Sequence, residues 1–299
     1  MKFNQLCLIL MACLVAEAKE PVDGPKYNFV CADFSKGEVC VVNSKGEILR
    51  RFKTQNPNDV WSLPNGEVLF AWKRGVKIYD KDGKLAFEWS SSEKKDEIHT
   101  CQPLADGNIL IAQNGPSRLI EVNRKGEIIK EIPVKSKNDN LHMRFRMCRK
   151  LNTGNYLCMM SCDNEIREID SSGKTVRVIR DIPGVQMAKA HAVMRLANGN
   201  TLFSTGAGAM AVEVDPDDKV VWKLERKDLP EIKMGFMTGL NRLSNGNTVI
   251  CFYQGSHHLI EVTPEKKLVW KWKLPSQRTV VSVQVLDQQG DASKGQIAK

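Results

Sequence analysis

Residues 191–224 read HAVMRLANGNTLFSTGAGAMAVEVDPDDKVVWKL and divide into four short strand-like segments separated by turn residues. The segments are HAVMRL (191–196), NTLFST (200–205), MAVEVD (210–215) and KVVWKL (219–224). Apolar and polar residues alternate along them, and no helical period of 3.6 residues competes with this alternation. The stretch therefore predicts a unit of four β-strands joined by tight turns.

This unit repeats six times along the chain. One marker of the repeat is Leu-x-x-Gly followed by an apolar strand, and successive leucines lie 41 to 47 residues apart. Such a period, filled by four short strands, is typical of a β-propeller blade. The marker leucines are Leu63, Leu104, Leu151, Leu196, Leu243 and, in a degenerate copy with one inserted residue, Leu286. We therefore predict an all-β fold, a six-bladed β-propeller.

The two ends of the repeat array complement each other. The first unit begins near Tyr27 and lacks an innermost strand, whereas residues 280–286 form an innermost strand with no outer strands after it. We expect this C-terminal strand to pair with the N-terminal blade, because closing the ring removes exposed edge strands. The predicted propeller domain spans residues 19–290, and residues 291–299 are predicted to form a polar tail.

Residues 1–18 have the parts of a secretory signal peptide. Lys2 provides a positive charge, residues 6–16 form an unbroken apolar run, and residues 16–18 (AEA) make a cleavage site of the A-x-A kind. We expect export to the periplasm or the extracellular space. Lipoprotein anchoring at Cys13 is the less favoured alternative. No later segment is apolar over the length that a membrane span requires.

Seven cysteines follow the predicted signal peptide, and their spacing does not match a zinc finger. Cys31 and Cys40 flank a turn at equal distances, so we expect them to face each other across a hairpin. They are the best candidates for a disulfide, although most of the cysteines fit small apolar positions on strands.

The repeat motifs resemble a known family. HAVMRLANGNTL (191–202), followed by VEVDPDDKVVW (212–222), resembles the bacterial quinoprotein-like (PQQ-like) propeller repeats and, more weakly, the propeller of the arylsulfotransferases. Quinone dehydrogenases of that superfamily are usually eight-bladed and carry extra ligands for the cofactor and a metal ion. This chain has six units and no recognisable equivalent of those ligands, so we expect the shared blade architecture without a cofactor.

The residue five positions before each marker leucine should lie near the mouth of the central funnel, where propellers commonly bind ligands. Reading round the ring, these residues are Asn58, His99, Arg146, His191 and Thr238, with Val281 in the closing blade, or Ser282 if the inserted residue shifts the register. The residues two positions further on are apolar. A polar ring above an apolar one predicts a binding pocket, the alternative being a polar cap on a solvated channel.

The segment RFRMCRK (144–150) places four cations at the start of one inner strand. Arg144 and Arg146 should share a face by the two-residue period, and their guanidinium groups suit carboxylate, sulfate or phosphate oxygens. The net charge of +9 also favours an anionic partner. The leading prediction is therefore an exported, non-catalytic binding module whose partner is an anionic small molecule or glycan, or a protein of the cell envelope. Solvated charges or ion pairs between blades are the alternative reading of this segment.

The second hypothesis is an enzyme of the sulfotransferase, lyase or hydrolase kind that uses His191 and His99 with Arg146. The arylsulfotransferases take up a sulfuryl group on a histidine, and the resemblance assigns that role to His191, with His99 and Arg146 among its helpers. The chain lacks the extra N-terminal region of those enzymes. The third hypothesis is a structural module that docks to other envelope proteins.

The sequence shows no motif for metal binding, for serine or metal-dependent hydrolysis, or for nucleotide binding. His257 and His258 are adjacent on a strand and point to opposite faces, so they cannot both easily hold one metal ion, and no metal site is predicted. The chain contains no G-x-S-x-G, Walker or H-E-x-x-H motif. Export and the lack of an aromatic-plus-basic surface motif argue against nucleic-acid binding.

Overall fold

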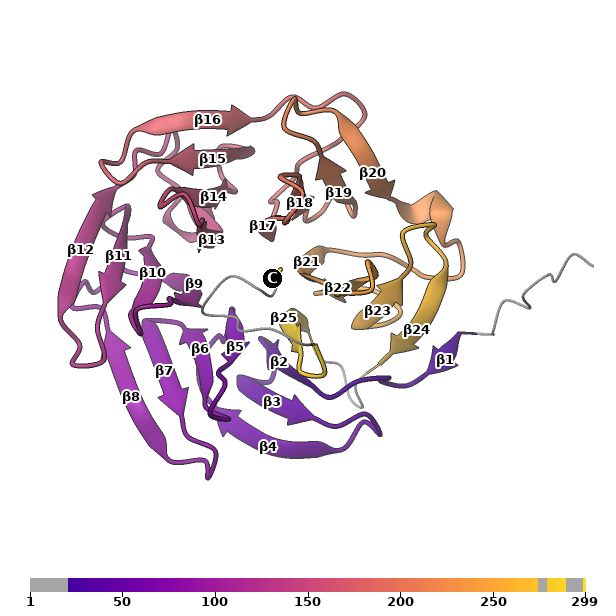
Figure 1. Cartoon of the computed structure of the whole chain (residues 1–299), viewed down its shortest axis with the longest axis horizontal. Coiled ribbons are helices and arrows are strands. Elements are labelled where there is room, and N and C mark those ends of the chain that lie inside the picture. Colours follow the sequence, from indigo (N-terminus) through magenta and orange to yellow (C-terminus); the bar gives the residue numbers. More distant parts are fainter. Residues whose placement is uncertain (1–20, 274–278, 289–297) are drawn as a thin grey trace, which may run out of the picture.

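A computed structural model describes residues 21–273, 279–288 and 298–299. Six β-sheets stand around a central axis like the blades of a propeller, and the chain visits them in order (Figure 1). Five of these sheets have four strands and the sixth has five. The six-bladed β-propeller predicted from the repeats is therefore confirmed.

The strands of each blade follow one another from the centre outwards. Blade 1 consists of β25 (Val280–Val285), β2 (Phe29–Asp33), β3 (Glu38–Val42) and β4 (Ile48–Lys53). Blade 2 consists of β5 (Val60–Ser62), β6 (Val68–Trp72), β7 (Gly75–Tyr79) and β8 (Leu85–Ser90). Blade 3 consists of β9 (Ile98–Pro103), β10 (Ile109–Gln113), β11 (Arg118–Val122) and β12 (Ile128–Pro133).

The second half of the ring is built in the same way. Blade 4 consists of β13 (Phe145–Lys150), β14 (Tyr156–Met160), β15 (Glu165–Ile169) and β16 (Thr175–Ile179). Blade 5 consists of β17 (Val193–Arg195), β18 (Thr201–Ser204), β19 (Ala211–Val214) and β20 (Val220–Leu224). Blade 6 consists of β21 (Met237–Arg242), β22 (Thr248–Phe252), β23 (Leu259–Val262) and β24 (Leu268–Trp272), with β1 (Val22–Asp23) outside β24. Two short 3₁₀ helices, η1 (Leu141–Met143) and η2 (Arg226–Asp228), lie in the connections before blades 4 and 6.

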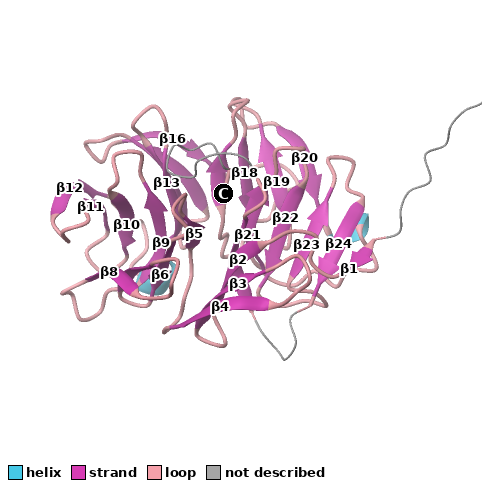
Figure 2. Cartoon of the chain, turned by 60° about the horizontal axis from the view of Figure 1, so that its bottom comes forward, coloured by secondary structure: helices cyan, strands magenta, loops and turns pink. Residues whose placement is uncertain are grey.

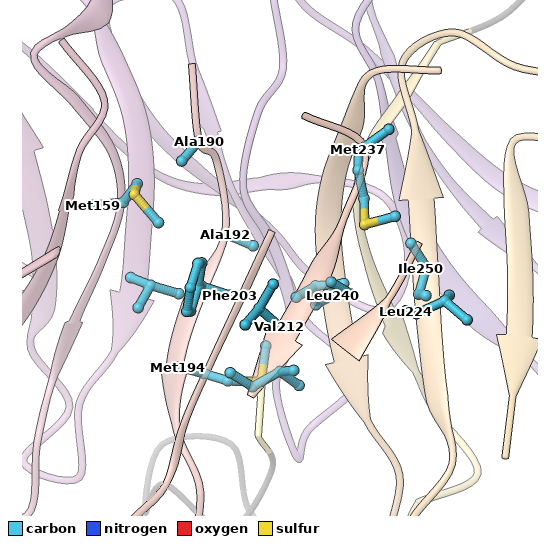
Figure 3. Packing of buried hydrophobic residues seen from close by; sticks show 14 of the residues in the cluster. Met159, Ala190, Ala192, Met194, Phe203, Val212, Leu224, Met237, Leu240 and Ile250 are labelled. Atoms are coloured by element: carbon cyan, nitrogen blue, oxygen red, sulfur yellow. The ribbon is translucent and has the colours of Figure 1, made fainter. Parts of the chain in front are cut away.

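The hydrophobic core lies between neighbouring blades. The second and third strands of each blade are buried almost throughout, whereas the outermost strands alternate or face solvent. Figure 3 shows this packing between blades 5 and 6, where Phe203 and Val212 lie near Leu240 and Ile250. Since each sheet buries both faces against its neighbours, even the polar residues that alternate along the inner strands are largely buried, whereas those of the outer strands face solvent.

The C-terminal strand closes the ring. Strand β25 pairs antiparallel with β2 and occupies the innermost place of blade 1, as the repeat pattern predicted. Strand β1 is an addition that the sequence did not predict: it pairs in parallel with β24, at the rim of blade 6 (Figure 2). In blade 1, Cys31 and Cys40 lie directly opposite each other across the β2–β3 hairpin, as expected, and a disulfide between them stays a prediction.

The last residue lies at the centre of the molecule (Figure 1). Residues 291–299 were predicted to form a polar tail, and most of them lie outside the described residues. Lys299, however, is 2% exposed, and the carbonyl oxygen of Ala298 accepts hydrogen bonds from Arg242 and Asn241 of blade 6. A buried lysine needs a compensating negative charge, and Asp59 in the central channel provides it. Across the described residues, no helix is long and apolar enough to cross a membrane.

Candidate functional site

A pocket of about 330 Å³ opens at one end of the inner strands. Five of the six residues that lie five positions before the marker leucines line it: Asn58, Arg146, His191, Thr238 and Val281. In blades 1, 4 and 6 these residues sit where the inner strand shifts register against its neighbour. Such bulges break the two-residue alternation and redirect a side chain. The bulges therefore account for the orientation of Val281, Arg146 and Thr238, whereas Asn58 and His191 lie just before their inner strands begin.

Of the two residues considered for the closing blade, Val281 lines the pocket and Ser282, predicted as a ligand-binding residue, does not. The inserted residue of the sixth repeat follows the strand and leaves the register within it unchanged. The Ser282 hydroxyl instead lies deeper in the channel, 3.2 Å from Asp59 Oδ1.

The pocket has a cationic wall and an aromatic wall. Blades 4 and 5 contribute Arg146 and Lys189. Blades 1 and 6 contribute three rings, with Tyr253 between Phe34 and Phe236 at centroid distances of 6.0 and 6.2 Å. This arrangement suits a ligand that has a negative group at one end and an apolar or ring-shaped face at the other.

Arg146 is the principal cation of the pocket. Its Nη2 lies 3.0 Å from His142 Nε2 and 3.1 Å from Met143 Sδ, while its buried Nε has no hydrogen-bond partner in the part of the chain that the structure describes. No carboxylate of the described residues forms an ion pair with it within 4.0 Å. Burial lowers the pKa of Arg146 to about 10, and the charge of Glu97 partly opposes this shift. The guanidinium therefore stays cationic at neutral pH.

His191 lies beside Arg146 on the pocket wall and is 6% exposed. Its Nδ1 is buried without a hydrogen-bond partner among the described residues. Burial, followed by the charges of Arg146 and His99, lowers the pKa of His191 well below 6.5. His191 is therefore a neutral imidazole with an uncommitted ring nitrogen at neutral pH.

The expectation that Arg144 and Arg146 share a face is wrong. Arg144 has helical backbone angles at the end of η1, one residue before β13 begins, so the strand period does not reach it. Its Nη1 donates to the backbone oxygens of Asn114 and Gly115 in blade 3. Arg144 therefore ties two blades together and does not line the pocket.

His99 also lies outside the pocket lining, although it occupies the equivalent repeat position. Its Nε2 is 3.2 Å from Glu97 Oε2 and its Nδ1 is 2.8 Å from Asn114 Nδ2. The ring of His142 packs edge-on against it with centroids 5.2 Å apart, and His142 lines the pocket itself. The connection before blade 4 therefore covers His99 and presents a second histidine in its place.

A buried ionic network lies in the central channel, and the sequence did not reveal it. Asp59 Oδ2 accepts from Arg149 at 2.8 Å, and Asp59 Oδ1 accepts from the Lys299 ammonium at 2.7 Å. Both cations also lie over the ring of Trp61, at 4.9 and 4.4 Å from its centroid. Burial opposes the ionisation of Asp59, but Arg149 and Lys299 outweigh it and lower its pKa. The available signal was an acidic residue at a channel position where the other repeats carry neutral residues.

No protein-family model matches the chain, and no curated protein matches it. The resemblance of the repeats to the quinoprotein-like family therefore stays a prediction. Solved structures do match. A protein of unknown function from Bacteroides caccae is 24% identical, with a TM-score of 0.78 over 86% of this chain and 98% of that one.

Two further structures are more distant. A catalytically inactive variant of virginiamycin B lyase from Staphylococcus aureus, solved with quinupristin, is 11% identical, with a TM-score of 0.62 over 87% of this chain and 88% of that one. The extracellular domain of a putative hybrid two-component system from B. thetaiotaomicron is 14% identical, with a TM-score of 0.56 over 86% of this chain and 36% of that one. At these identities the likeness shows the fold alone: the chain is a β-propeller.

Proposed function

We propose that this protein is an exported binding module that takes a small anionic molecule, with a ring or other apolar face, into the pocket at the funnel mouth. The observation that carries the proposal is the position of Arg146, a cation on the pocket wall with no carboxylate partner among the described residues. A cation that is largely withdrawn from water is costly when the carboxylate that supports it, here Glu97, lies beyond ion-pair distance. A bound carboxylate, sulfate or phosphate would supply that counter-charge.

The other pocket residues support the same ligand chemistry. Lys189 adds a second cation and holds a φ of 59°, a conformation that is uncommon for residues other than glycine and that often accompanies functional sites. Neutral His191 and the Asn58 amide offer hydrogen bonds without a negative charge. The pocket volume of about 330 Å³ is at the lower end for ligand sites, which favours a monosaccharide-sized acid over a long polymer.

Isothermal titration calorimetry tests the proposal with D-glucuronate, phenyl phosphate and 4-nitrophenyl sulfate as probes and D-glucose as the neutral control. Arg146→Gln should weaken binding of the best anion about 10- to 100-fold, since a charge-assisted hydrogen bond contributes about 1.5–3 kcal/mol. Arg144→Gln is the matched control, because this arginine lies two residues away and outside the pocket. Equal losses in both variants, or equal affinity for glucose, would contradict the proposal.

Sulfuryl transfer is the second candidate, and the uncommitted Nδ1 of His191 favours it. In such a step the sulfur–oxygen bond of an aryl sulfate breaks, a sulfur–nitrogen bond forms to His191, and the phenolate leaves. Release of 4-nitrophenolate from 4-nitrophenyl sulfate in the presence of a phenol acceptor measures this activity. Turnover that His191→Gln abolishes would support catalysis. Binding without turnover would support the non-catalytic binding module instead.

The signal peptide predicted at residues 1–18 lies outside the described residues. N-terminal sequencing of the protein recovered from the culture medium or the cell envelope decides whether cleavage follows Ala18. An N-terminus at Cys13 would instead indicate the lipoprotein alternative.

A further inference from the structure

Three potential metal ligands converge behind the wall of the pocket. Glu97 precedes β9, His99 lies in β9, and His142 lies in η1 on the connection to blade 4. One carboxylate oxygen, Glu97 Oε2, lies 3.2 Å from His99 Nε2 and 2.5 Å from His142 Nδ1. One ligand atom from each residue lies within 4.8 Å of the other two. Two of these side chains lie at the start of blade 3, one just before β9 and one within it, and the third comes from a different connection.

We infer that Glu97, His99 and His142 bind a divalent transition-metal ion of the zinc class. Two imidazole nitrogens and one carboxylate are a ligand set that zinc and related ions prefer. Ligand atoms around one tetrahedral Zn²⁺, at about 2.0–2.1 Å from the ion, lie about 3.3 Å apart. The distance of 3.2 Å between His99 Nε2 and Glu97 Oε2 is close to this value, the 2.5 Å contact between Glu97 Oε2 and His142 Nδ1 has to open, and the ligand atoms of the two histidines lie within 4.8 Å of each other.

The contacts of His99 define the proton shift that metal binding requires. The Asn114 amide nitrogen donates to His99 Nδ1 at 2.8 Å, so the metal-free ring carries its proton on Nε2, which faces Glu97. When an ion takes the Nε2 lone pair, the proton moves to Nδ1, which then donates to the oxygen of Phe145 at 3.1 Å once the Asn114 amide turns away. Ligating histidines commonly donate their second nitrogen to a carbonyl or carboxylate in this way. The burial of His99, which is 5% exposed, restricts the ring to this orientation.

The remaining coordination positions can face the pocket. His142 is 54% exposed and lines the pocket wall, whereas Glu97 is 33% exposed. Three protein ligands leave a fourth position of a tetrahedral ion for water or an added ligand. The site therefore lies beside Arg146 but uses none of the residues that carry the proposed anion binding.

Cobalt(II) is the probe, because its visible absorption bands report the geometry of an imidazole and carboxylate site. Full-length protein freed of metal by chelation should bind one equivalent of Co²⁺ with visible bands, and Zn²⁺ should displace it. His142→Gln and Glu97→Gln should each weaken Co²⁺ binding at least 10-fold. His257→Gln, a histidine remote from the cluster, is the matched control and should leave binding unchanged.

A second variant acts in the opposite direction. The Asn114 side chain accepts from Phe145 N and holds its amide nitrogen 2.8 Å from His99 Nδ1. Asn114→Asp puts a carboxylate oxygen there, which accepts the Nδ1 proton of the ligating ring. It should tighten Co²⁺ binding about 10-fold or more. Circular dichroism checks that each variant is folded, and His142 is exposed enough for its replacement to leave the core intact.

Three results would overturn the inference. These are the absence of saturable Co²⁺ binding by the wild type, equal binding by all variants, and a thiolate-to-cobalt band that assigns the ion to a cysteine. Anion binding is measured separately in the presence of a chelator, so failure of the metal site leaves the proposed function untouched and the reverse also holds.

Discussion

Asp59 is fully buried and is held by two cations that come from distant parts of the chain, Arg149 and Lys299. Arg149 donates through two nitrogens, at 2.8 and 3.3 Å, and the Lys299 ammonium donates at 2.7 Å. A network of this kind is stable only while it is complete, because each remaining charge would otherwise be left in a medium of low dielectric constant.

Asp59→Asn should lower the free energy of unfolding by about 3–5 kcal/mol, since it leaves two buried cations without a counter-charge. Denaturant unfolding followed by tryptophan fluorescence measures the change. Glu67→Gln, which breaks the Arg124–Glu67 pair at the surface, is the control and should cost about 1 kcal/mol or less. An Asp59 variant as stable as this control would contradict the account.

The same network sets a pH dependence. Because the pKa of Asp59 is lowered, its contribution to the free energy of unfolding is fully present above pH 3.8 and is lost only at strongly acidic pH.

His191 also makes the protein less stable as the pH falls, but it does so in a higher pH range than Asp59. In the unfolded chain a histidine takes up a proton as the pH falls through 6.5, whereas buried His191 resists protonation until well below that value. The folded state therefore keeps its full stability above pH 6.5 and loses stability as the pH falls below it. His191→Gln should flatten the decline in Tm between about pH 7 and pH 5. Part of the remaining slope belongs to His99, whose pKa burial lowers to about 4, and part to His257, whose pKa burial also lowers. A slope identical to that of the wild type would contradict this assignment.

At the residue scale, the pocket was more predictable than the clusters around it. The marker leucines fix the register of each inner strand, so one offset found Asn58, Arg146, His191 and Thr238 from sequence alone. The metal-ligand cluster escaped prediction because His142 lies in an irregular connection that has no repeat position. Side chains brought together by such connections leave no periodic pattern in the sequence.

At the scale of the strands, two inner strands, β21 and β25, approach closely where blade 6 meets blade 1. A Cβ atom on Gly239, in β21, would lie 2.8 Å from the backbone oxygen of Val281 and 2.9 Å from Ser282 Cα in β25. Both contacts are with backbone and cannot relax by a side-chain rotation. Glycine is therefore required by space at this position and not by its backbone angles.

Gly239→Ala should lower the free energy of unfolding by about 1–3 kcal/mol, the usual cost of overpacking. Gly83→Asn is the control. Gly83 has a φ of +82° at a hairpin with open space around it, and asparagine tolerates this conformation, so the change should cost less than about 1 kcal/mol. Thermal unfolding of both variants measures the difference, and equal Tm values would show that blades 1 and 6 can move apart without cost.

The strands themselves were largely predictable, since each carries the apolar pattern of a blade and is followed by a turn signal. Strand β1 was not, because two residues paired in parallel with β24 show no periodicity and depend on the finished rim of blade 6. The burial of Lys299 has the same explanation. From the sequence alone, an isolated lysine is predicted to lie in solvent, because its partner Asp59 is placed beside it only when the ring has formed the central channel.

At the scale of the whole molecule, ring closure depends on one strand. Deleting residues 279–299 removes β25 and exposes the edge of β2, so the protein should aggregate. Deleting residues 289–299 keeps β25 and serves as the control, which should stay monomeric but lose the contribution of Lys299. Size-exclusion chromatography distinguishes the two. A synthetic peptide of residues 279–288 should restore the monomer of the shorter protein by adding the missing strand, and a monomer without peptide would contradict the closure account.

The pairing of β2 with β25 also determines how the ring responds to tension. Phe29, at the start of β2, is opposite Val285, at the end of β25. Just beyond them, Leu286 N donates to Asn28 O at 2.8 Å, and the Asn28 side chain donates to Asp287 at 2.9 Å. A force that separates Asn28 from Leu286 would therefore load one hydrogen-bonded pair at a time and unzip the seam, whereas a shearing force would load all pairs together. The ring is therefore mechanically weak when force is applied between Asn28 and Leu286, even though the same strand pair closes it at rest.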